Sequence, residues 1–314
     1  MPPYLKGGIM TENEFLLFDR EVKIRSVIEQ YGEENFYISF SGGKDSTVLS
    51  ALIDMALPDN RIPRVYANTG IELNMVRDFV LKKQKEDDRI VVIKPTMPIR
   101  EMLERDGYPF KSKKHANFVK LYQKFGTTEN HAGLEHYLHV SNDGINWKPQ
   151  NSCPKCLKYQ FQPDFNLKIS DMCCMNLKEK PLAKWQKENN KPYSILGIMR
   201  EEGGRRSKSN CLAFTGGKFK AFQPLVAVTK EWEEWFIKEH NIDICDLYKE
   251  PYNFPRTGCK GCPFALHLQH ELDTLKKFFP NERKQCEIIW KPVYEEYRRL
   301  GYRLKKGEEN GQNY

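Results

Sequence analysis

Of all segments in the chain, residues 36–49 restrict the possible folds most. They read FYISFSGGKDSTVL: an apolar, β-forming run leads to Gly42 and Gly43, and a helix-compatible segment follows. Because glycine permits backbone conformations that other residues avoid, this order predicts a strand, a tight turn and the start of a helix. The N–H groups of such a turn, with the positive end of the helix dipole behind them, favour an anion such as phosphate.

The glycine pair belongs to a hexapeptide composed of Ser41, Gly42, Gly43, Lys44, Asp45 and Ser46. This hexapeptide resembles the SGGKDS signature of the PP-loop ATP pyrophosphatases, which split ATP between its α- and β-phosphates, and it lacks the Walker A spacing. The resemblance implies that the serines and the loop amides bind the diphosphate, that Lys44 offsets its charge, and that Asp45 helps to hold Mg²⁺. A glycine-rich turn without a ligand is the alternative.

Strands and helices alternate around this loop. A helix is predicted over residues 12–31, strands over residues 64–70 and 89–95, and further helices over residues 72–86 and 98–107. Such alternation favours an α/β fold with a doubly wound, mainly parallel sheet and helices on both faces. The resemblance implies the adenine nucleotide alpha hydrolase-like version of this fold.

A second segment is expected near the loop, because ligands of such sheets bind beyond the carboxyl ends of the strands. The sequence NTGIE, which begins at Asn68, resembles the DTG-x-E segment of phosphoadenosine phosphosulfate (PAPS) reductase-like PP-loop proteins. The resemblance implies that Asn68, Thr69 and Gly70 lie beside the nucleotide. Asn68 replaces the usual acid, so the charge that the family has at this position is absent here.

The cysteines form the second strong pattern. A vicinal pair, Cys173 and Cys174, precedes a C-x-x-C turn formed by Cys259 and Cys262. Four such thiolates can surround an iron–sulfur cluster or a zinc ion, and spacing alone does not decide between them. The pair, the following Lys178 and Pro-Leu step, and the later G-C-x-x-C turn are similar to the pattern of adenylylsulfate (APS) reductases, which implies a 4Fe–4S cluster close to the nucleotide. Buried free thiols are the alternative.

A further C-x-x-C, formed by Cys153 and Cys156, lies in a polar segment. It is a weaker metal candidate, because three interpretations are open. The pair could hold zinc together with two other ligands, it could be a redox-active thiol pair, or the two cysteines could be close by chance. The remaining cysteines, Cys211, Cys245 and Cys286, stand alone and are expected in the core.

A predicted buried strand over residues 194–199 is followed by Arg200, Arg205 and Arg206. This segment resembles the family's strand-G-x-R-x-x-E-x-x-R pattern, whose arginines meet phosphate or sulfate groups. A guanidinium suits that role because its planar fork can donate two hydrogen bonds to an oxyanion. The candidate catalytic residues are therefore Lys44, Asp45, Arg200 and Arg205, with an exposed basic loop as the alternative for the arginines.

Four regions are expected. Residues 1–106 and 171–264 form the nucleotide-binding domain with the cluster cysteines, residues 107–170 a basic and aromatic insertion, and residues 265–314 a helical C-terminal region. The insertion combines lysines with Phe118, Tyr122 and Phe125, a mixture used to bind single-stranded nucleic acid. A helix with a solvated lysine face has the same composition. Aromatic residues near Trp232 follow a helix and are expected in the core.

The composition favours a globular protein of the cytoplasm. The hydrophobic content of 39% argues against disorder, and no run reaches the roughly 20 apolar residues that cross a bilayer. The N-terminus lacks the apolar core of a signal peptide. In a reducing compartment the nine cysteines are expected as metal ligands or reactive thiols. The net charge of +8 suits either a polyanionic partner or a solvated surface.

These features predict an iron–sulfur enzyme that cleaves ATP·Mg²⁺ to AMP and diphosphate and adenylates an acceptor, from which a sulfur nucleophile displaces AMP. That chemistry resembles the DNA-phosphorothioation ATP pyrophosphatases and, more distantly, the tRNA-thiolating PP-loop enzymes. The expected partners are an adenine nucleotide, a sulfur donor such as a thiol or a persulfide protein, nucleic acid as a candidate acceptor, and a second copy of the chain.

Two alternatives remain open at this point. A sulfonucleotide reductase that forms sulfite would need a nucleophilic thiol, such as that of Cys153 or Cys156, because the family's C-terminal E-C-G-[LI]-H segment is missing after Cys286. A regulator without catalytic activity could use the loop to sense a nucleotide and the cysteines to sense oxidation.

Overall fold

The structure is a computed structural model that describes residues 10–126, 132–138, 152–203 and 206–306. The chain divides into two compact units built from separated stretches of sequence. The first comprises Met1–Asn68, Glu72–Pro95 and Lys180–Thr257, and the second comprises Thr69–Ile71, Thr96–Glu179 and Gly258–Tyr314. The glycine-rich loop therefore belongs to the first unit, and the four candidate cluster cysteines belong to the second.

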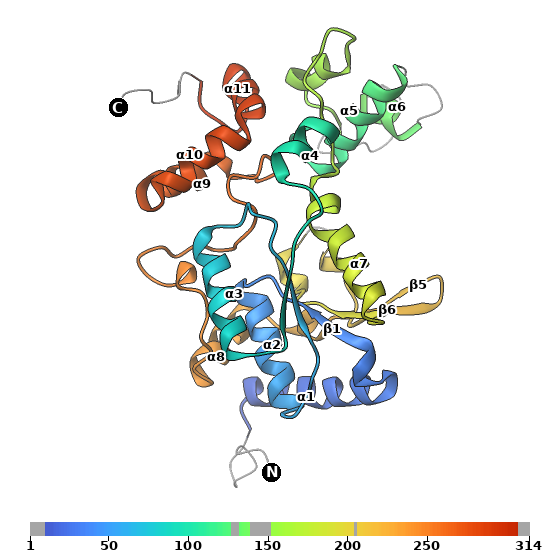
Figure 1. The fold of residues 1–314 in the computed structure, drawn as a ribbon, viewed down its shortest axis with the longest axis vertical. Helices are drawn as coiled ribbons and strands as arrows, with labels where there is room; N and C mark the ends of the chain where they lie inside the picture. The colour runs from blue at the N-terminus through green and yellow to red at the C-terminus, as the bar shows by residue number, and fades with distance from the viewer. Residues whose placement is uncertain (1–9, 127–131, 139–151, 204–205, 307–314) are drawn as a thin grey trace. The chain divides into compact units, whose positions relative to one another are not determined.

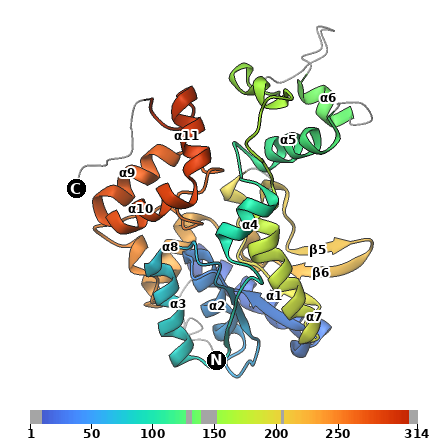
Figure 2. The ribbon, with the colours of Figure 1, turned by 45° about the horizontal axis from the view of Figure 1, so that its top comes forward.

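The first unit contains a six-stranded sheet in the order β3-β2-β1-β4-β6-β5. Figure 1 labels its strands β1, β5 and β6. Its strands are β1 (Phe36–Ser39), β2 (Arg64–Ala67), β3 (Ile90–Ile93), β4 (Tyr193–Ile195), β5 (Leu212–Thr215) and β6 (Lys218–Phe222). Neighbouring strands are parallel except β5 and β6, which form an antiparallel hairpin at the edge (Figure 2). The predicted α/β fold is confirmed. The strand order reverses at β1, and open α/β sheets bind ligands at such a switch point.

Helices of the described part of the first unit are α1 (Glu12–Tyr31), α2 (Lys44–Ala56), α3 (Asn74–Glu86), α7 (Lys180–Glu188) and α8 (Lys230–Glu239). Short 3₁₀ turns lie at Glu33–Asn35, Arg200–Glu202, Arg206–Lys208, Pro224–Ala227 and Asp246–Tyr248. α1 begins at a capping box, in which Thr11 Oγ1 accepts from the N–H of Glu14 (3.3 Å) and the Glu14 carboxylate accepts from the N–H of Thr11 (2.7 Å). This cap explains why the predicted helix starts at Glu12.

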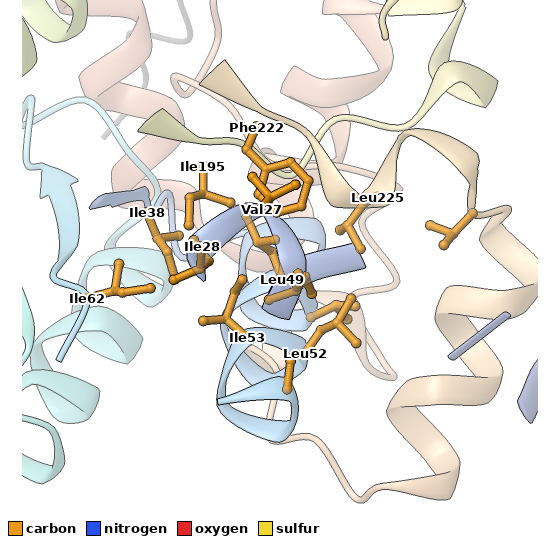
Figure 3. Close-up of a cluster of buried hydrophobic side chains, with 14 of the residues drawn as sticks. Val27, Ile28, Ile38, Leu49, Leu52, Ile53, Ile62, Ile195, Phe222 and Leu225 are labelled. Carbon is orange, nitrogen blue, oxygen red and sulfur yellow. The ribbon is translucent and has the colours of Figure 1, made fainter. Parts of the chain in front are cut away.

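One apolar core holds β1 and α2, and therefore the loop between them. Figure 3 shows the side chains that converge there from α1, α2, β1, β4 and β6: Val27, Ile28, Ile38, Leu49, Leu52, Ile53, Ile195 and Phe222. Burial of each contributes about 1.5–3 kcal/mol. Alternation along β1 turns Tyr37 to the opposite face, where its ring lies 5.5 Å from that of Trp185 on α7. Helices thus cover both faces of the sheet.

The predicted strand over residues 194–199 is shorter than expected. β4 ends at Ile195, and the N–H of Leu196 makes the next hydrogen bond, to Phe222 O at 2.9 Å. Gly197 then approaches the start of α2, since a Cβ at this position would lie 3.0 Å from Asp45 O. The chain leaves the sheet here because it passes against the backbone of α2, an approach that glycine permits.

The second unit is mainly helical. Its elements are α4 (Ile99–Asp106), α5 (Lys113–Phe125), α6 (Ala132–Leu138), a 3₁₀ segment at Lys155–Phe161, a π-helical turn at Met175–Glu179, α9 (Leu268–Phe278), α10 (Pro280–Ile289) and α11 (Lys291–Leu300). Prolines in the first turns of α10 and α11 divide the predicted C-terminal helical region into three helices. In the part of the chain that the structure describes, no helix is both long and apolar enough to cross a membrane.

Candidate functional site

The glycine-rich loop connects β1 to α2 at the carboxyl edge of the sheet. Gly42 has a φ of +71°, and a Cβ at this position would lie 2.5 Å from Val80 Cγ2. Gly43 is the N-cap of α2, and a Cβ there would lie 3.1 Å from Ser41 Oγ. The backbone therefore turns sharply into a helix N-terminus, which favours an anion.

The two serines of the hexapeptide close the loop on itself. Ser41 Oγ and Ser46 Oγ are 3.0 Å apart, and Ser46 Oγ donates to Gly43 O at 2.9 Å. The N–H of Gly43 donates to Ser41 Oγ at 3.2 Å. These contacts gather Ser41, Gly43 and Ser46 in one turn, and their contact with a diphosphate stays a prediction.

Lys44 meets a residue that no motif indicated. Its Nζ atom lies 2.9 Å from Glu233 Oε2, and the Glu233 side chain is fully buried while that of Lys44 is 18% exposed. Glu233 lies in the first turn of α8, which Thr229 caps by accepting from the N–H of Trp232. The sequence signal for this contact was weak: Glu233 lies on the same helix face as the buried residues Trp232 and Phe236.

Asp45 shares this environment. Burial raises the pKa of Asp45, and the charge of Glu202 raises it further, whereas a hydrogen bond with Glu233 and the charge of Lys44 lower it. Burial, followed by the charge of Asp45, raises the pKa of Glu233 to about 7. Carboxyl groups so close to one another favour a cation or a proton, and Asp45 is the residue that would hold Mg²⁺.

Two hydroxyl groups cover Gly43. Tyr248 OH and Thr257 Oγ1 lie 2.6 Å apart, and a Cβ on Gly43 would lie 3.1 Å from either oxygen. Burial raises the pKa of Tyr248 to about 12, and hydrogen bonds with Thr257 and the Lys44 backbone lower it. Both hydroxyls add hydrogen-bonding groups at the loop, and neither Tyr248 nor Thr257 was predicted as a site residue from the sequence motifs.

The NTG segment lies at the end of β2, where its residues serve different contacts. Asn68 follows β2 directly, and its N–H donates to Ile93 O at 2.8 Å, so it shares the carboxyl edge of the sheet with Ser41. Thr69 is buried, and its Oγ1 atom accepts from the N–H of Ile71 at 3.5 Å. Gly70 is exposed and has a φ of +79°.

Of the candidate arginines, Arg200 is exposed, and its Nε atom donates to Ser209 O at 2.8 Å. Arg206 forms an ion pair with Glu202. Arg205 lies outside the described residues. An oxyanion contact for Arg200 and Arg205 therefore stays a prediction.

The second unit brings the four candidate cluster thiols near one another. Burial raises the pKa of Cys173, and the charges of Cys259, Cys174 and Cys262 raise it further. Burial and the charges of Cys259 and Cys174 likewise raise the pKa of Cys262. A set of four thiols fits the donor chemistry of an iron–sulfur cluster or zinc. Among the described residues, no three Cys, His, Asp or Glu side chains are already close enough to enclose a metal ion.

The C-x-x-C turn is held from behind by the C-terminal helices. Gly261 has a φ of +59°, and its N–H donates to Glu271 Oε1 at 2.8 Å. Side chains of the segment 290–297 donate to three carbonyls of the turn: Trp290 Nε1 to Lys260 O (3.0 Å), Tyr294 OH to Gly261 O, and Tyr297 OH to Pro263 O (2.9 Å). The backbone of the turn is thereby fixed by hydrogen bonds with side chains of α9, of α11 and of its N-cap residue Trp290.

The second C-x-x-C has a different environment. Cys153 is buried, which raises its pKa to about 11, and Lys111 and Lys158 oppose that shift. Cys156 is exposed. The role of this pair therefore stays open. Of the lone cysteines, Cys245 and Cys286 are buried as expected.

The basic insertion uses much of its aromatic surface internally. Phe118 packs against Tyr137 with ring centroids 5.0 Å apart, and Tyr122 packs against Phe161 at 5.8 Å. Phe125 is 48% exposed. Of the rings expected to stack on bases, two are thus committed to the packing of α5.

The sheet, its switch point and the loop between β1 and α2 define a doubly wound α/β protein with an anion-favouring turn at the carboxyl edge of its sheet. Residues 110–265 match the model of the phosphoadenosine phosphosulfate reductase domain. The matched residues make up just under half of the chain. The loop at residues 41–46 precedes the matched stretch.

A relative in Methanocaldococcus jannaschii, an uncharacterized protein, is 35% identical over 287 residues, which are 88% of this chain and 54% of that protein. The chain thus spans about half the length of this curated relative. Among solved structures, PAPS reductase from Candida auris has a TM-score of 0.43 at 11% identity, covering 76% of this chain and 92% of that one. The U34-tRNA thiolase NcsA from Methanococcus maripaludis, with its [4Fe-4S] cluster, has a TM-score of 0.37 at 16% identity, covering 96% and 84%.

Proposed function

We propose that this protein is an ATP pyrophosphatase that adenylates an acceptor for sulfur transfer. The observation that carries the proposal is the closed SGGKDS turn at the switch point of the sheet, with Lys44 and Asp45 in the first turn of α2. A phosphate at a helix N-terminus gains from the backbone N–H groups and from the helix dipole.

The reaction would proceed by in-line displacement. An acceptor oxygen attacks the α-phosphorus, the bond to the α,β-bridging oxygen breaks, and diphosphate leaves with that electron pair. Lys44 and the loop amides stabilise the charge that develops on diphosphate, and Asp45 would hold Mg²⁺, which when bound would offset the negative charge of the phosphates. A sulfur nucleophile then displaces AMP from the adenylated acceptor, for which nucleic acid is a candidate.

Cys173, Cys174, Cys259 and Cys262 would hold a 4Fe–4S cluster, which when bound supplies electron-transfer or sulfur-binding chemistry. The protein is prepared under argon, and iron, sulfide and zinc are measured together with the visible spectrum. We expect about four irons and four sulfides per chain and loss of colour in Cys173→Ala and Cys259→Ala. A colourless protein that holds zinc would make these residues a structural zinc site.

Activity is tested by measuring AMP and diphosphate formed from ATP, with tRNA or DNA as acceptor and a persulfide donor. We expect Lys44→Ala to lower the rate at least about a hundredfold, as removal of a transition-state contact does. Absence of diphosphate release from every acceptor, with fold and metal content intact, would contradict the proposal.

The match to the PAPS reductase domain favours a second candidate, reduction of a sulfonucleotide. In that reaction a thiolate attacks the sulfur of the substrate, the bond from this sulfur to the phosphate oxygen breaks, and the nucleotide leaves with that electron pair as AMP or adenosine 3′,5′-bisphosphate. A dithiol reductant then cleaves the enzyme S-sulfonate, which releases sulfite and leaves the reductant as a disulfide. The same protein is therefore incubated with PAPS or APS and thioredoxin. Sulfite release that depends on Cys153 or Cys156 would favour this second reaction.

A further inference from the structure

We propose that Glu233 is a positioning residue for Lys44, and that its carboxylate competes with the phosphates of a nucleotide for the Lys44 ammonium group. The inference rests on the proposed function only in that the ligand of the loop is an adenine nucleotide.

The geometry ties the two side chains to each other. Lys44 Nζ lies 2.9 Å from Glu233 Oε2, and the carboxylate is fully buried. Both carboxylate oxygens of Glu233 are buried, and the ion pair with Lys44, together with a hydrogen bond to Asp45, compensates for this burial. A buried carboxylate without a cation is costly, and the pair therefore holds Lys44 in one position.

The same geometry creates competition. When the ammonium group of Lys44 moves onto a phosphate, Glu233 stays buried beside Asp45 without its cation. The negative charge of Asp45 acts on Glu233, and the negative charge of Glu202 acts on Asp45. Nucleotide binding must therefore overcome the Lys44–Glu233 attraction. Glu233→Gln keeps the size of the side chain and removes its charge, so the competition ends.

We expect Glu233→Gln to tighten ATP binding about tenfold, which corresponds to about 1.4 kcal/mol, because close charge pairs with little solvent have coupling energies of at least this size. The dissociation constant for ATP is measured by titration calorimetry with Mg²⁺ and with EDTA, at about pH 8.5, where the carboxyl is ionised. Glu234→Gln is the matched control, since Glu234 is the exposed neighbour on α8 with the same charge. We expect its affinity to stay within about twofold of the wild type.

A double-mutant cycle separates competition from a general effect of charge. In a Lys44→Met background, we expect Glu233→Gln to change the affinity by less than about twofold. An equal gain in both backgrounds, or weaker binding by Glu233→Gln alone, would overturn the inference. A wild type that does not bind ATP would instead sink the proposed function, and the inference with it.

Thermal unfolding gives a readout that needs no nucleotide. Lys44→Met leaves the buried carboxylate without its cation, so we expect a lower Tm, and Glu233→Gln added to Lys44→Met should restore most of the loss. Glu233→Met is used in the same cycle if Glu233→Gln does not fold. A Tm that falls further in the double variant would contradict the pairing.

Discussion

At the scale of single residues, the backbone of Gly42 decides the shape of the loop. Its φ of +71° is unfavourable for other residues, and a Cβ would lie 2.5 Å from Val80 Cγ2. We therefore expect Gly42→Ala to weaken ATP binding at least about tenfold, because the loop must shift to relieve both strains. Gly203→Ala is the control, since Gly203 also has a positive φ but has no atom within 4 Å of its Cβ position. Equal affinity of Gly42→Ala and the wild type would contradict this role.

A second residue-scale prediction concerns His115, a buried histidine of α5. Its Nδ1 and Nε2 atoms lie 2.9 Å from Tyr137 OH and 2.7 Å from Gln160 Oε1, and burial lowers its pKa from 6.5 to about 4. The unfolded chain thus binds the proton more readily. The contribution of His115 to stability is present above about pH 6.5 and is lost as the pH falls towards 4, by about 3 kcal/mol in full.

The measurement is the free energy of unfolding by urea as a function of pH. We expect His115→Phe to be less stable than the wild type at pH 7, because Tyr137 and Gln160 lose their partner, and to lose less stability between pH 6.5 and 4. His270→Gln is the control, since His270 is exposed. Parallel pH profiles for His115→Phe and the wild type would rule out a buried neutral histidine.

The loop residues were predictable from sequence because chemistry and spacing coincide in six consecutive positions. Glu233, Tyr248 and Thr257 were not, because each reaches the loop from a distant part of the chain through the packing of the first unit. Glu233 stands between two tryptophans, and the helix was correctly assigned to the core. A carboxylate on that buried face needs a cationic partner, but the sequence alone does not indicate that the partner is Lys44.

At the scale of elements, the C-terminal helices support the C-x-x-C turn. A Cβ on Gly261 would lie 2.3 Å from Tyr294 OH, and that hydroxyl donates to Gly261 O. We expect Tyr294→Phe to lower the metal content per chain, because the carbonyl left unpaired in the core costs about 1–3 kcal/mol and loosens the turn. Tyr122→Phe on α5 is the control in the same unit.

Metal content is measured after purification under argon, and the rate of metal loss to a chelator is compared at a temperature where both variants stay folded. Faster loss in Tyr294→Phe, with an unchanged rate in Tyr122→Phe, is the expected outcome. Identical rates in both variants would mean that α11 only stabilises the unit and does not position the thiols.

Most elements were predictable because periodicity and capping signals agree locally. α1 has its capping box, and the starts of α10 and α11 contain prolines. The predicted strand over residues 194–199 failed because its end depends on contact with the backbone of α2 at Gly197, a tertiary constraint. The hydrophobic pattern could not contain that information.

At the scale of the whole molecule, the loop and the thiols belong to different compact units, each with its own packing. The loop, the cysteines and a nucleotide-binding domain interrupted by an insertion were all predicted from sequence, whereas the bounds of the two units depend on which distant segments pack together. Separate units have a measurable consequence: damage to one site should leave the other intact.

We therefore expect Cys262→Ser to lose metal while its dissociation constant for ATP stays within about twofold of the wild type, and Lys44→Ala to show the reverse. The reason is that each substitution removes a side chain whose partners lie within its own unit. Metal analysis and ATP titration on the same preparations test both arms. If Cys262→Ser also weakens ATP binding more than about tenfold, with an unchanged Tm, the two sites are energetically coupled, and metal binding regulates the nucleotide loop.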